Sequence, residues 1–147
     1  MSVNDFFCDH IKKNFSYTPT PCQNILFDTL SSFTMQHDEC DIMVVNGYAG
    51  TGKTSAIAAY VKTLKEFEIK FKLMAPTGRA AKVLAGYTGY SSLTIHKQIY
   101  RQKSSADVMS KFTLDFNKAN DTVYIVDEAS LISIDSPGSL FGSGNLL

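Results

Sequence analysis

Residues 47–54, which read GYAGTGKT, restrict the possible folds of this chain more than any other segment. Three glycines in eight residues are costly in an ordered segment, because glycine loses more backbone freedom on folding than any other residue. Glycines at this density allow successive N–H groups to turn inward and form a nest for an anion. Gly47, Gly52, Lys53 and Thr54 satisfy the pattern G-x-x-x-x-G-K-[ST]. The segment therefore predicts a phosphate-binding loop rather than a structural glycine turn.

The residues on either side of this loop indicate a strand before it and a helix after it. Residues 41–46, DIMVVN, form an unbroken apolar run rich in β-branched side chains, which is typical of a parallel strand buried on both faces. The helix predicted from Lys53 carries one apolar stripe and adds its positive N-terminal end to the loop. The stripe consists of Ile57, Val61, Leu64 and Phe67. We expect nucleotide phosphates to be bound by Gly47, Tyr48, Ala49, Gly50, Thr51, Gly52, Lys53, Thr54 and Ser55.

Two further strands are predicted, and they alternate with helical segments. Residues 68–76, EIKFKLMAP, alternate apolar and polar side chains, which predicts a half-exposed strand at the edge of the sheet. Residues 77–87, TGRAAKVLAGY, predict a helix, and residues 122–130, TVYIVDEAS, predict a buried strand that ends in two carboxylates. Strands that alternate with helices indicate an α/β fold with a parallel sheet flanked by helices.

The first 40 residues are expected to be helical. Phe7, Ile11 and Phe15 follow one another at spacings of four, with Asn4 as the predicted N-cap. Thr20 is predicted to cap a second helix, in which proline occupies the first position. The side chains expected to point inward from this second helix are Ile25, Leu26 and Leu30.

Composition places few limits on the partners of the chain. Lys and Arg together number 14, as do Asp and Glu, so the net charge gives no indication of a polyanionic ligand. The three cysteines, Cys8, Cys22 and Cys40, have no metal-binding spacing and suit a reducing compartment. Because no segment approaches the length of a membrane span, we expect a cytoplasmic protein without a membrane partner.

Asp127 and Glu128 are the second chemical signal. They follow a predicted buried strand at its carboxyl end, where open α/β sheets bind ligands. Asp127 and the Thr54 hydroxyl are expected to hold Mg²⁺, Lys53 to reach the terminal phosphates, and Glu128 to act as general base on the attacking water. Ser130 stands where the GTPase pattern DxxG requires glycine, which argues against a GTPase. The paired Asp and Glu favour attack by water and therefore an ATPase. The alternative is a strand that ends in a polar turn.

The strings GYAGTGKT, APTGRAAKVL, TIHK and VDEASLIS, in this order and spacing, resemble the first motor domain of superfamily 1B DNA helicases. The resemblance is closest to RecD-like and Dda-like 5′-to-3′ enzymes and covers about residues 17–147. It implies a RecA-like P-loop NTPase fold, ATP and Mg²⁺ as cofactors, single-stranded DNA as partner, and a place in DNA repair and recombination. The motifs APTGRAA and TIHK are more specific to this group than the glycine loop.

The resemblance also implies roles for residues outside the loop. Gln23 matches the glutamine that reads adenine, and its alternative is an ordinary exposed helix glutamine. DNA contacts are implied for Thr77, Gly78, Arg79 and His96. The alternative for the first three is a capped helix start. For His96 the alternative is internal packing in a short helix capped by Thr94.

Part of the pattern of these helicases is missing from the sequence. They continue into a GD-x-x-Q-L-P segment and a second motor domain, which supplies an arginine finger. We therefore expect residues 1–147 to be the N-terminal part of a motor domain that is incomplete at its C-terminus and inactive alone. Residues 1–40 would be a helical lead-in, and residues 41–147 the P-loop core. The rival functions are a P-loop ATPase of another class and a DNA-binding module gated by nucleotide that does not hydrolyse it.

Overall fold

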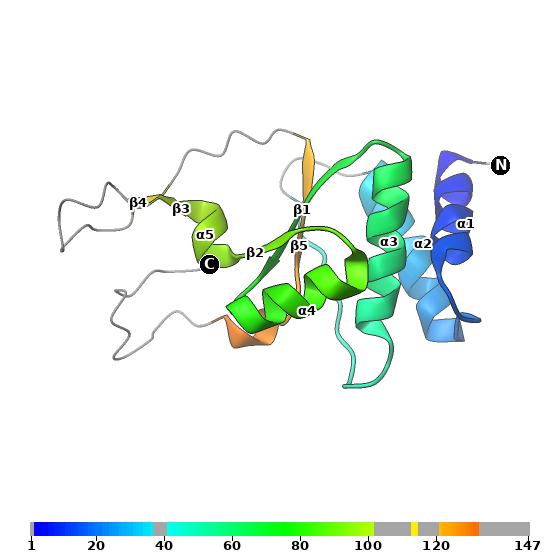
Figure 1. Ribbon diagram of the computed structural model, residues 1–147. Coiled ribbons are helices and arrows are strands. Elements are labelled where there is room, and N and C mark those ends of the chain that lie inside the picture. The colour runs from blue at the N-terminus through cyan, green and yellow to red at the C-terminus, as the bar shows by residue number, and fades with distance from the viewer. Residues whose placement is uncertain (1, 37–40, 102–112, 115–120, 133–147) are drawn as a thin grey trace. The chain divides into compact units, whose positions relative to one another are not determined.

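The computed structural model describes residues 2–36, 41–101, 113–114 and 121–132 (Figure 1). The chain divides into two compact units, residues 1–71 and residues 72–147. The sequence indicates a loop at the polar stretch of residues 101–110; Arg101 instead belongs to a strand, and the rest of the stretch lies outside the described residues. The glycine- and serine-rich residues 136–147 lie outside them as well.

The first unit contains three helices: α1 (Val3–Asn14), α2 (Pro21–Met35) and α3 (Lys53–Glu66) (Figure 1). Ser2, rather than the expected Asn4, is the N-cap of α1. The Ser2 hydroxyl accepts from the Asp5 backbone N–H at 3.3 Å, and the Asp5 carboxylate accepts from the Ser2 N–H at 2.9 Å. This reciprocal capping box starts the helix two residues earlier than an Asn4 cap would. Thr20 caps α2, with proline at its first position, as predicted.

Aromatic side chains form much of the core between these helices. Phe7 of α1 meets Tyr60 of α3 and also Phe67 edge-on, at centroid distances of 6.3 and 4.8 Å. The buried face of α2 carries Phe27, Leu30, Ser31 and Thr34, which are spaced as one helical stripe. Ile25 lies outside that stripe and is 65% exposed, so the prediction that it points inward is wrong.

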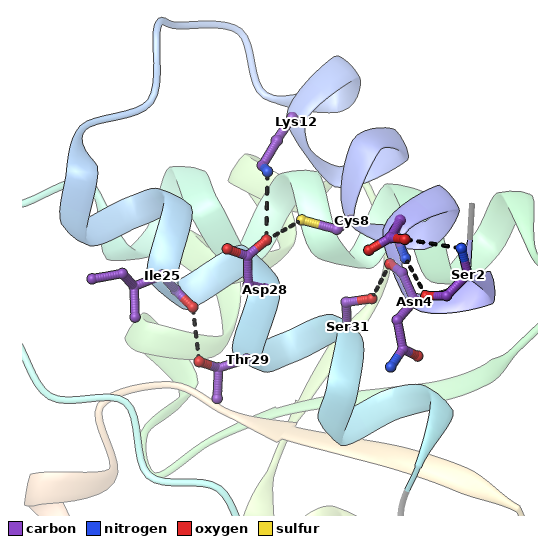
Figure 2. Close-up of polar contacts among 9 residues, drawn as sticks. Ser2, Asn4, Cys8, Lys12, Ile25, Asp28, Thr29 and Ser31 are labelled. Atoms are coloured by element: carbon purple, nitrogen blue, oxygen red, sulfur yellow. Dashed lines mark hydrogen bonds and ion pairs between the residues drawn. The ribbon is translucent and has the colours of Figure 1, made fainter.

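Polar contacts also connect α1 to α2 (Figure 2). The Cys8 thiol donates to the Asp28 carboxylate at 2.8 Å, and the Lys12 ammonium lies 3.4 Å from the same oxygen. The Ser31 hydroxyl donates to the Asn4 carbonyl at 2.6 Å. Burial and the hydrogen bond to Asp28 raise the pKa of the Cys8 thiol to about 11, which keeps it protonated and unreactive at neutral pH.

Three strands form a parallel sheet in the order β2-β1-β5. They are β1 (Lys70–Ala75), β2 (Ser92–Thr94) and β5 (Thr122–Val126) (Figure 1). β1 and β2 are parallel, with Leu73 opposite Ser92 and Ala75 opposite Thr94. Two residues each from β3 (Tyr100–Arg101) and β4 (Thr113–Leu114) form a separate antiparallel pair. The α/β fold with a parallel sheet is thus confirmed, and it agrees with a RecA-like P-loop NTPase.

Three short helical elements accompany this sheet in the second unit. They are α4 (Gly78–Thr88), α5 (Ile95–Ile99) and the 3₁₀ turn η1 (Ala129–Leu131). α4 contacts β2 and buries Ala81 and Leu84. None of the helices in the described ranges is long and apolar enough to cross a membrane.

β1 is the central strand, so its predicted position at the edge of the sheet is wrong. Its exposure falls along its length: Lys70 is exposed, and Leu73, Met74 and Ala75 are all buried. Consecutive buried residues mean that both faces of this end are covered. The alternation that suggested an edge came from Lys70 and Lys72, and Lys72 is half-buried because long lysine stems can pack on apolar surface.

Residues 41–46 do not form the predicted strand. Ile42 and Val44 are 88% and 74% exposed, although their sequence pattern is that of a buried strand. A strand requires a hydrogen-bonded neighbour, and within the described residues the three-stranded sheet does not include this segment. High β-propensity in the residues was therefore not sufficient to form the element.

Candidate functional site

Two glycines of the glycine loop in the first unit use the backbone freedom that glycine provides. Gly50 and Gly52 both lie in the left-handed region, with φ values of 78° and 80°. Gly52 is the N-cap of α3, and no side chain caps this described helix start. The N–H groups of the first turn are therefore left for another acceptor, and the positive end of the helix favours an anion there.

Lys53 folds back over this loop. Its ammonium donates to the carbonyl of Gly47 and, at 2.8 Å, to that of Tyr48. A Cβ on Gly47 would lie 3.3 Å from the Lys53 Cδ and 3.1 Å from the Thr51 hydroxyl oxygen, so there is little space for a side chain at this position. A side chain at residue 47 would therefore require these neighbours to shift by a few tenths of an ångström, and Lys53 places a positive charge at the loop.

Thr51 links two parts of the loop. Its hydroxyl donates to the Tyr48 carbonyl at 2.8 Å, and its N–H donates to the same oxygen at 3.4 Å. The Tyr48 side chain itself is 89% exposed. Ala49 is exposed as well, and Thr54 and Ser55 are half-buried in the first turn of α3.

Gln23, the residue predicted to read adenine, contacts the loop through α2. Its amide nitrogen donates to the Thr51 carbonyl at 3.2 Å. Its amide oxygen accepts from the Thr20 N–H at 2.9 Å, as the second half of a capping box. Both ends of the amide are thus engaged within the first unit.

The two carboxylates lie in the second unit, directly after β5. The Asp127 N–H donates to the Met74 carbonyl at 3.0 Å, which continues the pairing of β5 with β1. The Asp127 carboxylate accepts from the Glu128 N–H at 3.0 Å. Glu128 is exposed and has a φ of 55°, an uncommon conformation for a residue other than glycine. This left-handed residue therefore comes two positions after the end of β5, directly after Asp127.

The predicted DNA-binding residues follow the other two strands. After β1, the Thr77 hydroxyl accepts from the Ala80 N–H at 3.2 Å and so caps α4, as the structural alternative requires. Gly78 and Arg79 are exposed at the start of that helix. After β2, His96 is exposed, and its ring stacks on that of Tyr100 with the ring centroids 5.6 Å apart. His96 therefore does not pack internally.

The register of the sheet brings these residues to one edge. Thr77 and His96 each lie two residues beyond Ala75 and Thr94, which are opposite one another in β1 and β2. Asp127 is bonded to Met74, one residue before the end of β1. Because carboxyl ends of parallel strands meet at the same edge, the second unit presents its carboxylates beside its predicted DNA contacts.

A family model described as an AAA domain matches residues 31–143. The chain belongs to this AAA domain family. The family consists of P-loop NTPases and is associated with RecD-like helicases, so its members act with a bound nucleotide.

The AAA domain is also similar to one curated protein. The uncharacterised protein MJ1519 of Methanocaldococcus jannaschii is 30% identical to it over 111 residues. The match covers 68% of this chain and 9% of MJ1519, so the chain spans a small part of that relative. No solved structure matches the chain.

The residues of this AAA domain that could hold Mg²⁺ lie in different units, Thr54 in the first and Asp127 in the second. Both offer hard oxygen donors, which suit this ion. Among the residues that the structure describes, no group of three or more His, Cys, Asp or Glu side chains gathers into a metal site. Mg²⁺ is usually bound by few protein oxygens together with phosphate and water oxygens, and each of these residues offers such a donor.

Sequence reasoning did not predict the contact between Gln23 and the loop of the AAA domain. The spacing Thr20-x-x-Gln23 satisfies the capping-box pattern, so it could have placed the amide oxygen at the helix start. The bond to the Thr51 carbonyl spans 28 residues and has no local signal.

Proposed function

We propose that this AAA domain is part of an ATP-dependent DNA helicase of the RecD-like superfamily 1B group, which moves 5′ to 3′ along single-stranded DNA. One observation supports this most. Three parallel strands end at a single edge of the sheet, and Thr77, His96 and the Asp127–Glu128 pair follow these strand ends. A motor must couple nucleotide hydrolysis to its grip on DNA, and adjacent strand ends provide a short route for that coupling.

In this proposal the glycine loop binds the phosphates of ATP. The N–H groups of the loop and of the first turn of α3 surround the phosphates, and Lys53 exchanges its two carbonyl partners for phosphate oxygens. Thr54 and Asp127 would hold Mg²⁺, which neutralises phosphate charge when it is bound. Through its contacts with the phosphate oxygens, Lys53 would stabilise the negative charge that develops on the terminal phosphate.

Glu128 is the proposed general base. It is exposed and follows Asp127 directly beyond the carboxyl end of β5. Glu128 would accept a proton from the attacking water. The Asp127 carboxylate is held in its orientation by the hydrogen bond that it accepts from the Glu128 N–H. The arginine finger and half of the DNA track would come from a second motor domain of the same protein.

The experiment that tests the helicase function is an ATPase assay of the intact protein with and without single-stranded DNA. We expect turnover to be stimulated by DNA. Turnover without stimulation would favour an ATPase of another class, and DNA binding that responds to ATP without turnover would favour a non-hydrolysing module. A protein that binds neither ATP nor DNA would contradict all three functions.

A substitution tests the proposed DNA contacts. Arg79 is exposed at the start of α4, where a guanidinium can reach a DNA phosphate. Arg79→Ala should weaken single-strand binding by a similar factor for every sequence, because phosphates carry no sequence information. Lys62, exposed on α3, offers a matched control for the loss of one positive charge. An Arg79→Ala defect confined to one base composition would contradict a backbone contact.

A further inference from the structure

We propose that Gln23 is a positioning residue that holds the phosphate loop in its binding conformation. This inference rests on the proposed binding of a nucleotide by that loop. It assigns Gln23 to the phosphate end of the site, whereas the resemblance assigns it to the base.

The first support is the use of both ends of the amide. The oxygen accepts from the Thr20 N–H, which fixes the side chain to the start of α2. The nitrogen donates to the Thr51 carbonyl, which lies within the loop. Each end of the amide keeps one further donor or acceptor, but these two bonds fix the orientation of the whole group. The side chain therefore connects a rigid helix start to the loop.

The second support is the peptide that Gln23 contacts. In a trans peptide the carbonyl and the following N–H point in opposite directions. A hydrogen bond on the Thr51 carbonyl therefore turns the Gly52 N–H away from Gln23 and fixes its direction. This N–H belongs to the glycine loop directly before α3, so its direction matters for an anion bound there.

Gly52 explains why the loop needs such a restraint. Glycine crosses easily between backbone regions, so a peptide beside it can rotate at little cost. Gly52 has a φ of 80°, and the Gln23 amide is hydrogen-bonded to the preceding carbonyl, that of Thr51, while Gly52 is in this conformation. A Cβ at this position would lie 2.8 Å from the Gln23 amide nitrogen, so the amide packs directly on the glycine. The same residue that permits the turn leaves room for the side chain that restrains it.

The Thr51 contacts extend the restraint through the loop. The hydroxyl and the N–H of Thr51 both donate hydrogen bonds to the Tyr48 carbonyl, and the Lys53 ammonium donates to the same carbonyl. A continuous set of hydrogen bonds therefore runs from Thr20 through Gln23 and Thr51 to the lysine. Removing Gln23 should loosen the loop that binds phosphate.

The test compares a ligand that has a base with one that has none. In the intact protein, Gln23→Met keeps the approximate size of the side chain and removes both hydrogen bonds. We expect the affinity for inorganic tripolyphosphate with Mg²⁺ to fall about three- to tenfold, the effect of one hydrogen bond, and the affinity for ATP to fall by the same factor. The ratio of ATP to GTP affinity should stay at its wild-type value.

Thr20→Ala is the matched control. It removes the hydroxyl that caps α2 but leaves the Gln23 amide and its bond to the loop. It should lower the melting temperature without changing either affinity, which separates a weakened helix start from a loosened loop.

Three results would decide against the proposal, and they are distinguishable. An unchanged tripolyphosphate affinity with weakened ATP binding would assign Gln23 to adenine. Unchanged affinities for both ligands would show that the contact with Thr51 has no role in binding. A wild-type protein that binds neither ligand would overturn the nucleotide site itself, and this inference with it.

Discussion

Lys53 is held at the glycine loop by the carbonyls of Gly47 and Tyr48, so its ammonium is in place before any ligand binds. We predict that Lys53→Ala lowers the affinity for ATP at least about tenfold, because charge-assisted bonds to phosphate contribute roughly 1.5–3 kcal/mol. A nucleotide titration of the variant measures this. Lys62→Ala removes an exposed lysine from the same helix and should bind normally. Equal affinities for wild type and Lys53→Ala would reject the phosphate loop.

Glu128 allows binding and chemistry to be separated. Glu128→Gln keeps the shape of the side chain and removes the base, so turnover of the intact protein should fall by roughly 10²–10⁴. Binding of ATP should persist, because the loop is unaltered. Steady-state ATPase rates together with a binding titration provide the measurement. A variant that hydrolyses ATP at the wild-type rate would require a different base.

At the scale of elements, the contact between α1 and α2 should make stability depend on pH at the alkaline end. The pKa of Cys8 is raised from 9.0 to about 11 in the folded state. Folding therefore favours the protonated thiol, and this contribution is complete below about pH 9 and lost as the pH rises towards 11. We predict that the free energy of unfolding falls more steeply across this range for wild type than for Cys8→Ala. Chemical unfolding at several pH values measures both, and parallel curves would contradict the raised pKa.

α4 shows how one residue can have a structural and a functional role. Thr77 caps this helix, so Thr77→Ala should destabilise the protein by about 1 kcal/mol whether or not the threonine binds DNA. Thr77→Ser keeps a hydroxyl at the cap and should retain most of that stability. Thermal unfolding of the two variants measures the difference. Equal losses of stability in both would mean that the hydroxyl does not act as a cap.

Helices and strands were predictable where a local pattern determined them, and less so where neighbours decided. The cap of α2 at Thr20 and the strand that ends before Asp127 follow from adjacent residues, and both elements are confirmed. The predicted burial of this strand is wrong, because Ile125 is its only buried residue and Tyr124 is exposed. The position of β1 within the sheet depends on which strands pair with it, and its lysines gave a misleading signal. Ile25 was misplaced for a similar reason, since the stripe led by Phe27 determines which face of α2 is buried.

At the scale of the whole molecule, residues 41–46 are the largest departure from expectation. The glycine loop could be predicted from its sequence because its conformation depends on its own glycines, as Gly50 and Gly52 show. The apolar segment before the loop requires a partner strand, which no local pattern supplies.

That segment supports a prediction about the 147-residue chain expressed alone. Ile42 and Val44 are exposed in a run with high β-propensity and little charge, the profile of a segment that associates with other chains. We predict that the chain self-associates and melts without a sharp transition. The double substitution Ile42→Lys and Val44→Lys should increase the monomer fraction, because two positive charges oppose strand pairing between copies.

Analytical ultracentrifugation and thermal unfolding test this prediction. Lys substitutions at Val83 and Tyr87, which are exposed apolar positions on α4, provide a control for the added charge alone. A wild-type chain that is monomeric with a sharp transition would contradict the prediction, and the exposed segment would then be stable without a partner.

The left-handed backbone of Glu128 implies a conflict between durability and activity. Residues other than glycine, asparagine and aspartate pay about 1 kcal/mol or more for this conformation, yet the chain places its proposed base there. Selection for thermal resistance alone would favour asparagine or glycine at this position. A library of variants ranked only by resistance to heat should therefore accumulate replacements of Glu128, and those survivors should be the ones that no longer consume ATP.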